Sequence, residues 1–374
     1  MGILRMLLAL SVVLGHAKSK YDFVGGGLAV QSFYIISGFY MSLILNEKYI
    51  KGNNSYKLFI TNRFLRIYPI YWTILILVVL MPAIDYVFFH GQPGGPFGAY
   101  IKYFKSMDFG AFAFLVFTNI LLFFQDAVMF LGLDTSNGHL FFTSNFRQTN
   151  PQFYTFLFIP QAWTIGVELL FYVIAPFLVR KKIYWIIPLI FLSIGLRLFI
   201  YSHGLYHDPW TYRFFPTELV FFMLGIVSYH IYKLIRVKTI NKILLNSGLV
   251  AIILFIVLYP LINGSAKYYI FLILFFISLP FIFYMTKKWK VDNFIGELSY
   301  PIYICHNFVL HIMEVVFKHF KIYNNLLSLL VSIVAILLFS FALNELIAKR
   351  IEKYRQRRFA KSMVAPTLDV LPQS

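Results

Sequence analysis

Residues 4–20 read LRMLLALSVVLGHAKSK, an apolar run with an arginine near its start, Arg5, and a histidine near its end, His16. Such a run is typical of a membrane-spanning helix. Eleven residues are three turns plus roughly 20° at about 3.6 residues per turn, so both side chains lie on one face, about 16 Å apart. Ionisable residues inside a membrane are rare and mark functional sites or buried pairs. The alternative is that Arg5 only anchors the helix and His16 is interfacial.

The composition of the chain extends this interpretation to its whole length. Of 374 residues, 60% are hydrophobic and 13% charged, and the mean hydropathy is +0.74. Soluble domains have about a quarter charged residues, so repeated apolar stretches predict an all-α, polytopic transmembrane helical bundle. We expect about ten spanning helices, at residues 3–17, 26–45, 67–88, 161–179, 183–201, 215–232, 244–262, 268–285, 299–317 and 325–347.

The distribution of positive charge orients these spans. With both termini in the cytoplasm and segment 109–131 not crossing, 23 of the 33 lysines and arginines lie inside and nine outside. This agrees with the positive-inside bias, and a crossing segment 109–131 would reverse the later basic loops. We therefore expect a multi-pass protein of the bacterial inner (plasma) membrane, in which 109–131 is re-entrant or lies against the bundle. The net charge of +18 serves orientation and contact with membrane lipid, not nucleic acid.

The domain organisation follows from these spans. Residues 1–348 form one transmembrane domain, in which 89–160 is an extracytoplasmic loop with the re-entrant segment, and its proline and glycine residues near 93–98 favour a loop. Residues 349–374 form a basic cytoplasmic tail that contacts anionic lipid. The first 17 residues also imitate a signal peptide. We expect them to be retained, because cleavage would remove Arg5 and His16.

Glu168 is a carboxylate inside the span 161–179, with no lysine or arginine within one turn. Its partner must come from another helix. By this topology His16 lies at a similar depth, and a carboxylate that orients a histidine is a general-base arrangement. We therefore predict that the two side chains meet; the alternative is a structural salt bridge.

Arg63 and Arg66 lie in RFLRIYPIYW, at the inner mouth of the third span, with Pro69 in the first helical turn. Paired guanidinium groups suit phosphate, which they bind in a bidentate manner. The alternative is an orientation signal that contacts lipid headgroups.

Two further polar groups remain. Ser299, Tyr303 and His306 lie near the inner end of the ninth span, where His306 is either functional or a satisfied core residue. Arg197, Arg213 and Glu218 form an outer cluster, for a polar ligand or for internal pairing. The chain has no HExxH motif, and its single cysteine, Cys305, cannot form a cysteine metal cluster, so we expect no metal site. The single cysteine also excludes a disulfide within the chain. No serine lies in a GxSxG motif.

Five blocks in order resemble the membrane-bound acyltransferase-3 family, which includes bacterial O-acetyltransferases of surface polysaccharides. They are the Arg5–His16 spacing, GLAVQSFYIISGFYMSLIL with Ser37, RFLRIYPIYW, AWTIGVELLFYVIAP with Trp163 and Glu168, and IGELSYPIYICHNFVL. Thr164 stands where the family usually has serine. Leu169 stands where it often has a second acidic residue, so only Glu168 carries over. Nothing after the helices resembles the hydrolase-like domain of some members.

The resemblance implies an O-acyltransferase with no tightly bound cofactor that uses acetyl-coenzyme A, entering from the cytoplasm, as co-substrate. The residues expected at the donor are Arg5, Ser37, Arg63, Arg66, Tyr303 and His306. His16 would be the catalytic base and Glu168 its partner. The acceptor would be a sugar hydroxyl of a lipopolysaccharide O-antigen, a lipid-linked sugar or another surface glycan, near Trp163, Arg197, Arg213 and Glu218.

The alternative function is a secondary transporter or flippase-type protein for a sugar or an anionic substrate. Charged residues at membrane depth fit it. However, the sequence shows neither a repeat between its halves nor the paired broken helices of transporters. The sequence leaves the oligomeric state open.

Overall fold

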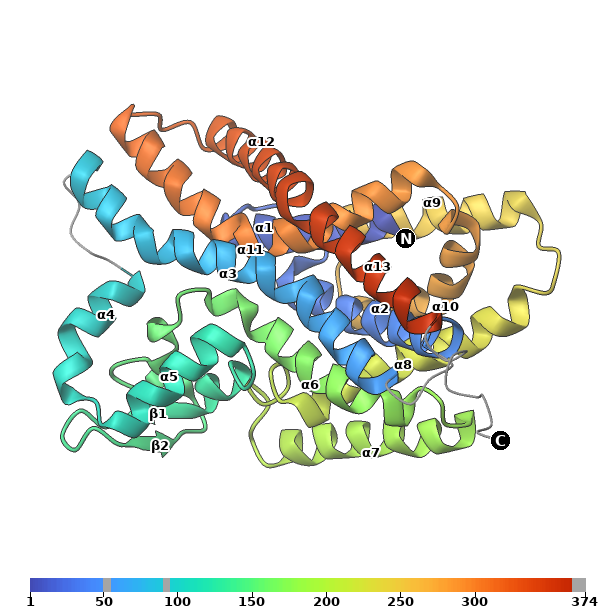
Figure 1. Ribbon diagram of the computed structural model, residues 1–374, viewed down its shortest axis with the longest axis horizontal. Coiled ribbons are helices and arrows are strands. Elements are labelled where there is room, and N and C mark those ends of the chain that lie inside the picture. The colour runs from blue at the N-terminus through green and yellow to red at the C-terminus, as the bar shows by residue number, and fades with distance from the viewer. Residues whose placement is uncertain (50–54, 90–94, 365–374) are drawn as a thin grey trace, which may run out of the picture.

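The computed structural model of the chain describes residues 1–49, 55–89 and 95–364, and it is almost entirely helical (Figure 1). The α-helices are α1 (Gly2–His16), α2 (Gly25–Glu47), α3 (Ser55–Phe89), α4 (Gly95–Tyr103), α5 (Phe109–Leu121), α6 (Trp163–Leu178), α7 (Ile183–Ser202), α8 (Phe215–Ile235), α9 (Lys242–Leu258), α10 (Ala266–Thr286), α11 (Lys290–His319), α12 (Asn325–Leu343) and α13 (Lys349–Val364). Two short antiparallel strands, β1 (Leu131–Leu133) and β2 (Leu140–Phe142), pair with Gly132 opposite Phe141.

Within the described ranges, eight helical stretches are long and apolar enough to cross a membrane. They are Gly25–Glu47, Ser55–Pro82, Pro160–Leu178, Ile183–Ser202, Phe215–Ile235, Ala266–Thr286, Lys290–His319 and Asn325–Ala360. Two shorter apolar helices, Gly2–His16 and Leu245–Leu261, stand where the first and seventh spans were predicted. The predicted all-helical, multi-pass membrane protein is thereby confirmed.

Close packing between α2 and α8 holds the centre of the bundle. A Cβ atom added at Gly38 of α2 would lie 2.0 Å from the Phe222 carbonyl oxygen, and one added at Gly225 of α8 would lie 2.1 Å from that of Ile35. Only glycine permits this approach, as is usual where helices pack without a hydrophobic driving force. The two glycines therefore fix the relative position of α2, which carries Ser37, and α8.

Helices α1 and α11 run side by side in the same direction. At one end the Asp292 carboxylate of α11 accepts hydrogen bonds from the backbone nitrogens of Gly2 (2.8 Å) and Ile3 (2.9 Å), which begin α1 and have no partner within it. At the other end His16 contacts His306. These contacts fix the register of the two helices, and so the position of Arg5 beside α11.

The segment 109–131 is not one continuous helix. Helix α5 ends at Leu121, because Leu122 adopts a left-handed conformation (φ 63°), and its 13 residues measure about 20 Å, less than the hydrocarbon core of about 30 Å. Its last carbonyl groups accept hydrogen bonds from three side chains of α3: Tyr71 to Asn119, Trp72 to Ile120 (2.9 Å) and Tyr68 to Leu121. The helix thus ends against α3, with its last carbonyl groups satisfied by these side chains.

Two spans begin earlier than predicted. Helix α3 starts at Ser55 instead of 67, and α11 at Lys290 instead of 299. Both extensions are rich in polar residues. Their mean hydropathy is therefore low, and the sequence predicted loops there. Pro69 consequently lies inside α3 and not in its first turn.

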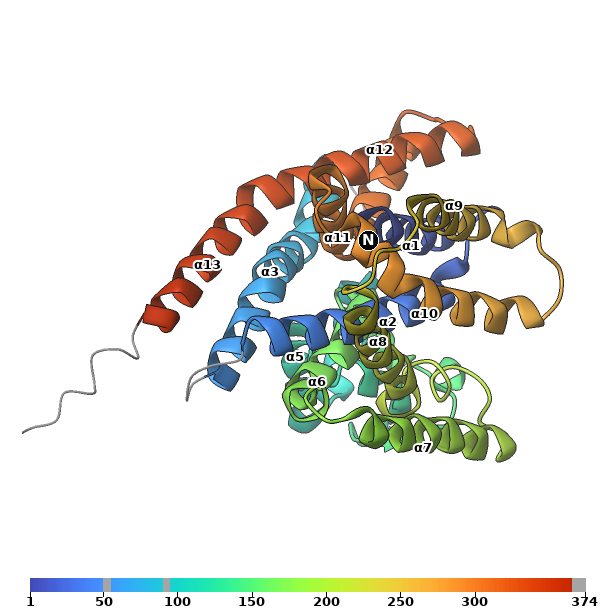
Figure 2. The ribbon, with the colours of Figure 1, turned by 90° about the vertical axis from the view of Figure 1, so that its right-hand side faces the viewer.

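Two regions predicted without regular structure are partly helical. Residues 95–103 form α4 in the segment expected as a loop, although Pro93 and Gly94 lie outside the described residues. The basic segment continues from α12 through a π-helical turn, Asn344–Ala348, into α13, which runs alongside α3 (Figure 2). Residues 365–374 lie outside the described part.

Candidate active site

A cavity of about 390 Å³ lies between α1, α2, α3, α6 and α11. Its polar lining residues are Arg5, Tyr34, Ser37, Tyr40, Arg63, Arg66, Thr164, Glu168, Tyr172, Asn293, Glu297, Ser299, Tyr300 and Tyr303. Five helices from distant parts of the sequence therefore contribute to one site. Most of the predicted donor-binding residues are brought together in it.

Three arginines line this cavity without a carboxylate partner. Arg5 lies 6.0 Å from the ring centre of Tyr40, and the buried Arg63 lies 5.8 Å from that of Phe59. Among the described residues, no carboxylate lies within 4.0 Å of Arg5, Arg63 or Arg66, and the Nε atom of Arg63 has no hydrogen-bond partner. Guanidinium groups turned into a cavity without a counter-ion suit an anionic ligand.

Two hydroxyl groups hold the Glu168 carboxylate in the same cavity. Its Oε1 accepts hydrogen bonds from the Oγ of Ser37 (2.5 Å), on α2, and from the hydroxyl of Tyr172, one turn along α6. Glu168 also lies within electrostatic range of Arg5 and Arg63 without contacting them. The two hydroxyls thus hold the carboxylate in place, and the three arginines keep no carboxylate contact.

Two histidines meet beyond the cavity, where α1 ends. The ring centres of His16 and His306 are 4.8 Å apart, edge to face. Each Nδ1 bonds to a carbonyl oxygen of its own helix, Val12 (2.9 Å) for His16 and Tyr303 (2.7 Å) for His306. Because a carbonyl only accepts, Nδ1 carries the proton in a neutral ring and Nε2 is the basic atom.

The two histidines differ in their exposure. His16 is exposed, whereas His306 is fully buried and its Nε2 has no hydrogen-bond partner. One imidazole therefore faces the surface and the other faces the interior of the bundle.

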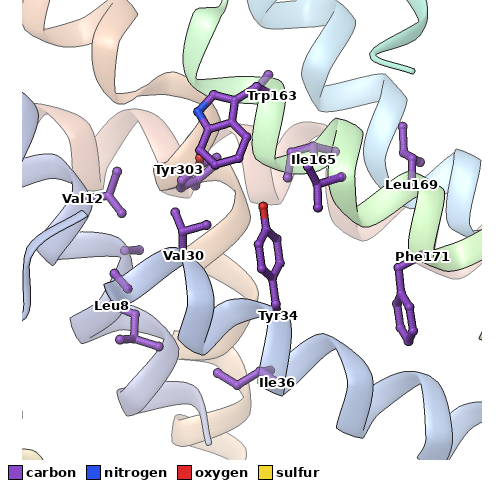
Figure 3. Close-up of a cluster of buried hydrophobic side chains, with 14 of the residues drawn as sticks. Leu8, Val12, Val30, Tyr34, Ile36, Trp163, Ile165, Leu169, Phe171 and Tyr303 are labelled. Atoms are coloured by element: carbon purple, nitrogen blue, oxygen red, sulfur yellow. The ribbon is translucent and has the colours of Figure 1, made fainter. Parts of the chain in front are cut away.

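Tyr303 connects the cavity to the histidines. Its hydroxyl group bonds to the Thr164 Oγ1 (2.6 Å) and the Gln161 carbonyl (2.8 Å), and its own carbonyl holds His306. In Figure 3 Tyr303 lies close to Trp163, and the hydroxyl of Tyr34 points from α2 toward α6. Thr164, at the position where serine was expected, supplies the same hydroxyl chemistry.

The predicted meeting of His16 and Glu168 is wrong. No described contact joins them, because Glu168 bonds to Ser37 and Tyr172 while His16 packs on His306. His306 was expected near the inner end of its span, but α11 begins nine residues earlier, so His306 lies mid-helix beside His16. Residue counts give depth within one helix, but they do not set the register between helices that are far apart in the chain.

The outer cluster does not line the cavity. Arg197 of α7 pairs with the fully buried Glu218 of α8 at 2.5 Å, which is the internal pairing left open by the sequence. Arg213 bonds twice to Asp208 (2.6 and 3.0 Å), and its guanidinium lies 4.3 Å from the ring centre of Trp163. The four residues expected at the acceptor thus form an ion pair and an arginine–tryptophan stack.

Several lining residues were missed at the sequence level. Tyr172 follows Glu168 by four residues, so helical spacing alone could have paired them. Asn293 and Glu297 lie in the part of α11 that was read as a loop. Tyr40 lies in a span with several aromatic residues, and nothing in the sequence marks it as the one that lines the cavity.

Comparison with known sequences follows this geometry. A sequence profile described as "Acyltransferase domain" matches residues 1–345. The chain belongs to the acyltransferase-3 family. It is therefore a multi-pass membrane protein of an acyltransferase family, as its sequence blocks predicted. Across the described residues, no group of three or more histidine, cysteine, aspartate or glutamate side chains could hold a metal ion.

Individual relatives of this acyltransferase are distant. An "Uncharacterized protein" of Aquifex aeolicus is 24% identical over 210 residues, 53% of this chain and 89% of the relative. Two proteins of Staphylococcus aureus, strains COL and MSSA476, are named "Putative O-acetyltransferase" and are each 24% identical over 339 residues, 81% of this chain. The chain spans about half the length of these staphylococcal relatives (49%). No solved structure matches the chain.

Proposed function

We propose that this acyltransferase-3 protein is an O-acyltransferase that moves an acetyl group from acetyl-coenzyme A to a sugar hydroxyl of a surface glycan, such as a lipopolysaccharide O-antigen. One observation carries the proposal. A cavity lined by three arginines without carboxylate partners reaches, through Tyr303, a pair of histidines of which one is exposed.

The arginine end is the proposed donor site. Arg63 and Arg66, one turn apart on α3, and Arg5 on α1 would bind the phosphates of coenzyme A, for which guanidinium groups are suited. The flexible arm of the donor would then extend along the cavity, past Ser37 and Glu168. Its thioester would lie near Tyr303, next to the histidines.

The histidine end is the proposed site of the chemistry. The Nε2 atom of His16 takes the proton from the sugar hydroxyl, whose oxygen attacks the thioester carbonyl. The carbon–sulfur bond then breaks, and the thiolate of coenzyme A leaves and receives that proton. The Tyr303 hydroxyl donates its one hydrogen to the Gln161 carbonyl and accepts from Thr164, so Thr164 would turn its hydrogen to the oxyanion of the tetrahedral intermediate.

His306 and Glu168 take supporting roles. His306 packs against the ring of His16 and holds its orientation. Glu168 fixes Ser37 and Tyr172 in the wall of the cavity, and its carboxylate balances part of the arginine charge when no donor is bound. Neither role requires Glu168 to touch His16.

The orientation in the membrane follows the positive-inside bias of the basic loops. The arginine end would face the cytoplasm, where acetyl-coenzyme A is made, and both termini would be cytoplasmic. The exposed His16 would face the opposite side of the inner membrane, where surface glycans are assembled. The enzyme would then carry an acyl group across the bilayer.

The test uses membranes that contain the protein, acetyl-coenzyme A labelled in its acetyl group and the glycan of the host cell. Label on the glycan with the natural protein, and its loss with His16→Ala, is the expected result. His203→Ala removes an exposed histidine at the end of α7 and is the matched control. If folded natural protein leaves the glycan unlabelled but moves sugar across vesicles, the transporter alternative is correct instead.

A further inference from the structure

Helix α13 is packed against the arginine end of the bundle. Arg358 donates to the Thr61 hydroxyl of α3 (3.2 Å), and the ring centres of Phe359 and Tyr49 are 5.4 Å apart. Figure 2 shows α13 continuing from α12 along α3. Helix α13 carries seven lysines and arginines and one carboxylate, Glu352. Despite this charge it packs on the bundle and is not a solvated tail.

Arg355 is the basic residue of α13 that this packing buries. Its exposed fraction is 9%, and one guanidinium nitrogen pairs with the Glu352 carboxylate at 2.5 Å. Its Nε has no hydrogen-bond partner, and its guanidinium lies within electrostatic range of Arg63 and Arg66. Three neighbouring cations, of which only Arg355 contacts a carboxylate, are a costly arrangement in a partly buried place unless an anion joins them.

We propose that Arg355 is a further residue of the donor site and binds a phosphate of the nucleotide part of coenzyme A. This inference rests on the proposed function. The donor carries a diphosphate and a separate 3′-phosphate, together more negative charge than the three arginines Arg5, Arg63 and Arg66 neutralise. An arginine on a neighbouring helix is suited to take the additional phosphate.

The burial of Arg355 favours a nucleotide over a lipid headgroup. Lipid headgroups would meet the exposed basic residues of the same helix, such as Lys353 and Arg357, on its outer side. Arg355 instead lies on the side that packs on the bundle, toward Arg63 and Arg66. The π-helical turn Asn344–Ala348 rotates the residues that follow it, and so sets which face of α13 meets α3.

The experiment measures binding of coenzyme A to the full chain in nanodiscs of phosphatidylcholine, by calorimetry. Arg355→Gln should weaken binding at least tenfold, because a charge-assisted hydrogen bond to phosphate is lost. Arg357→Gln removes the same charge from an exposed position two residues away and should change binding less than twofold. Dephospho-coenzyme A identifies the phosphate: if Arg355 holds the 3′-phosphate, the two variants bind this analogue equally.

Equal binding of coenzyme A by the two variants would overturn the proposal for Arg355. If Arg355→Gln does not fold, by size exclusion and thermal unfolding, Glu352→Gln replaces it. This variant frees the guanidinium and should bind at least as tightly as the natural chain; weaker binding contradicts the proposal. If Arg355→Gln instead reduces binding to phosphatidylglycerol vesicles alone, the ligand is lipid and the proposal is wrong. If the natural chain binds no coenzyme A, the proposed donor itself fails.

Discussion

The bundle holds two groups of arginines, of which one is paired with carboxylates and the other lines the cavity without a carboxylate contact. In the first group, Arg197 bonds to Glu218 and Arg213 bonds to Asp208. In the second group, Arg5, Arg63 and Arg66 share a cavity, and no described carboxylate contacts them. Arg197 and Arg213 are therefore structural groups, whereas an unpaired arginine facing a cavity is available to a ligand. The comparison decides, for the outer cluster, between the ligand and the internal pairing that the sequence had left open.

The largest effect is expected from His16→Ala. A positioned base contributes typically 10²–10⁴-fold, so transfer of label to the glycan should fall by about that factor while the protein stays folded. Initial rates at saturating donor measure it. Donor binding at the arginine end, about 16 Å away along α1, should be unchanged. A parallel loss of coenzyme A binding would contradict the separation of the two ends.

The next effect concerns the paired arginines. Arg197→Met leaves Glu218 buried without its counter-ion and should lower the free energy of unfolding by about 3–5 kcal/mol. Thermal unfolding in detergent measures the change. The double variant Arg197→Met with Glu218→Leu removes both charges and should recover most of the stability. If the single variant is as stable as the natural chain and only binding of the acceptor suffers, the pair is a substrate site after all.

A change to an unpaired arginine of the cavity should affect donor binding and not stability. Arg63→Gln breaks no described ion pair, so stability should change little, while the KM for acetyl-coenzyme A should rise about 10–100-fold through a lost charge-assisted contact. Steady-state kinetics at varied donor concentration measure it. Arg180→Gln is the control, since Arg180 bonds to the Tyr49 carbonyl and lines no part of the cavity. A large loss of stability in Arg63→Gln would place Arg63 with the structural arginines.

A smaller effect is expected at the end of α5. Tyr71→Phe removes the donor to the Asn119 carbonyl in a buried position, which should cost about 1–3 kcal/mol of stability. Tyr56→Phe is the control, because this tyrosine is exposed and donates over 3.3 Å. Thermal unfolding of both variants measures the difference. Equal stability would mean that α5 ends without need of its cap.

The smallest effect should appear in acid. The Ala111 amide and His139 lower the pKa of Asp108, which lies outside the spanning helices and caps α5. The ionised Asp108 therefore contributes its full share to the free energy of unfolding above the ordinary carboxyl pKa near 4. This contribution is lost as the pH falls through the lowered pKa of Asp108. Unfolding followed between pH 5 and 2 should show this slope, and Asp108→Asn should flatten it. An unchanged slope would assign the acid sensitivity to other carboxylates.

The sequence predicted the elements of this protein better than their contacts. The apolar stretches predicted the spans, and rare polar residues within them pointed to Arg5, Glu168, Tyr303 and His306, while the family resemblance pointed to Ser37. All five line the cavity or adjoin it. The contact of Glu168 with Ser37 and not with His16 could not be predicted, because packing sets the register between distant helices, as Gly38 and Gly225 do for α2 and α8. Nothing in the sequence distinguishes Tyr68, Tyr71 and Trp72 from other aromatic residues of the span. Only the fold shows that they donate hydrogen bonds to the last carbonyl groups of α5.

Those three aromatic side chains give α3 a mechanical role. Residues 63–72 of α3 carry both the two arginines of the cavity and the three side chains that bond to the end of α5. A displacement of α5 would therefore reach Arg63 and Arg66 through a few residues of one helix. Helix α3 therefore connects α5 directly to the cavity that is proposed to bind the donor.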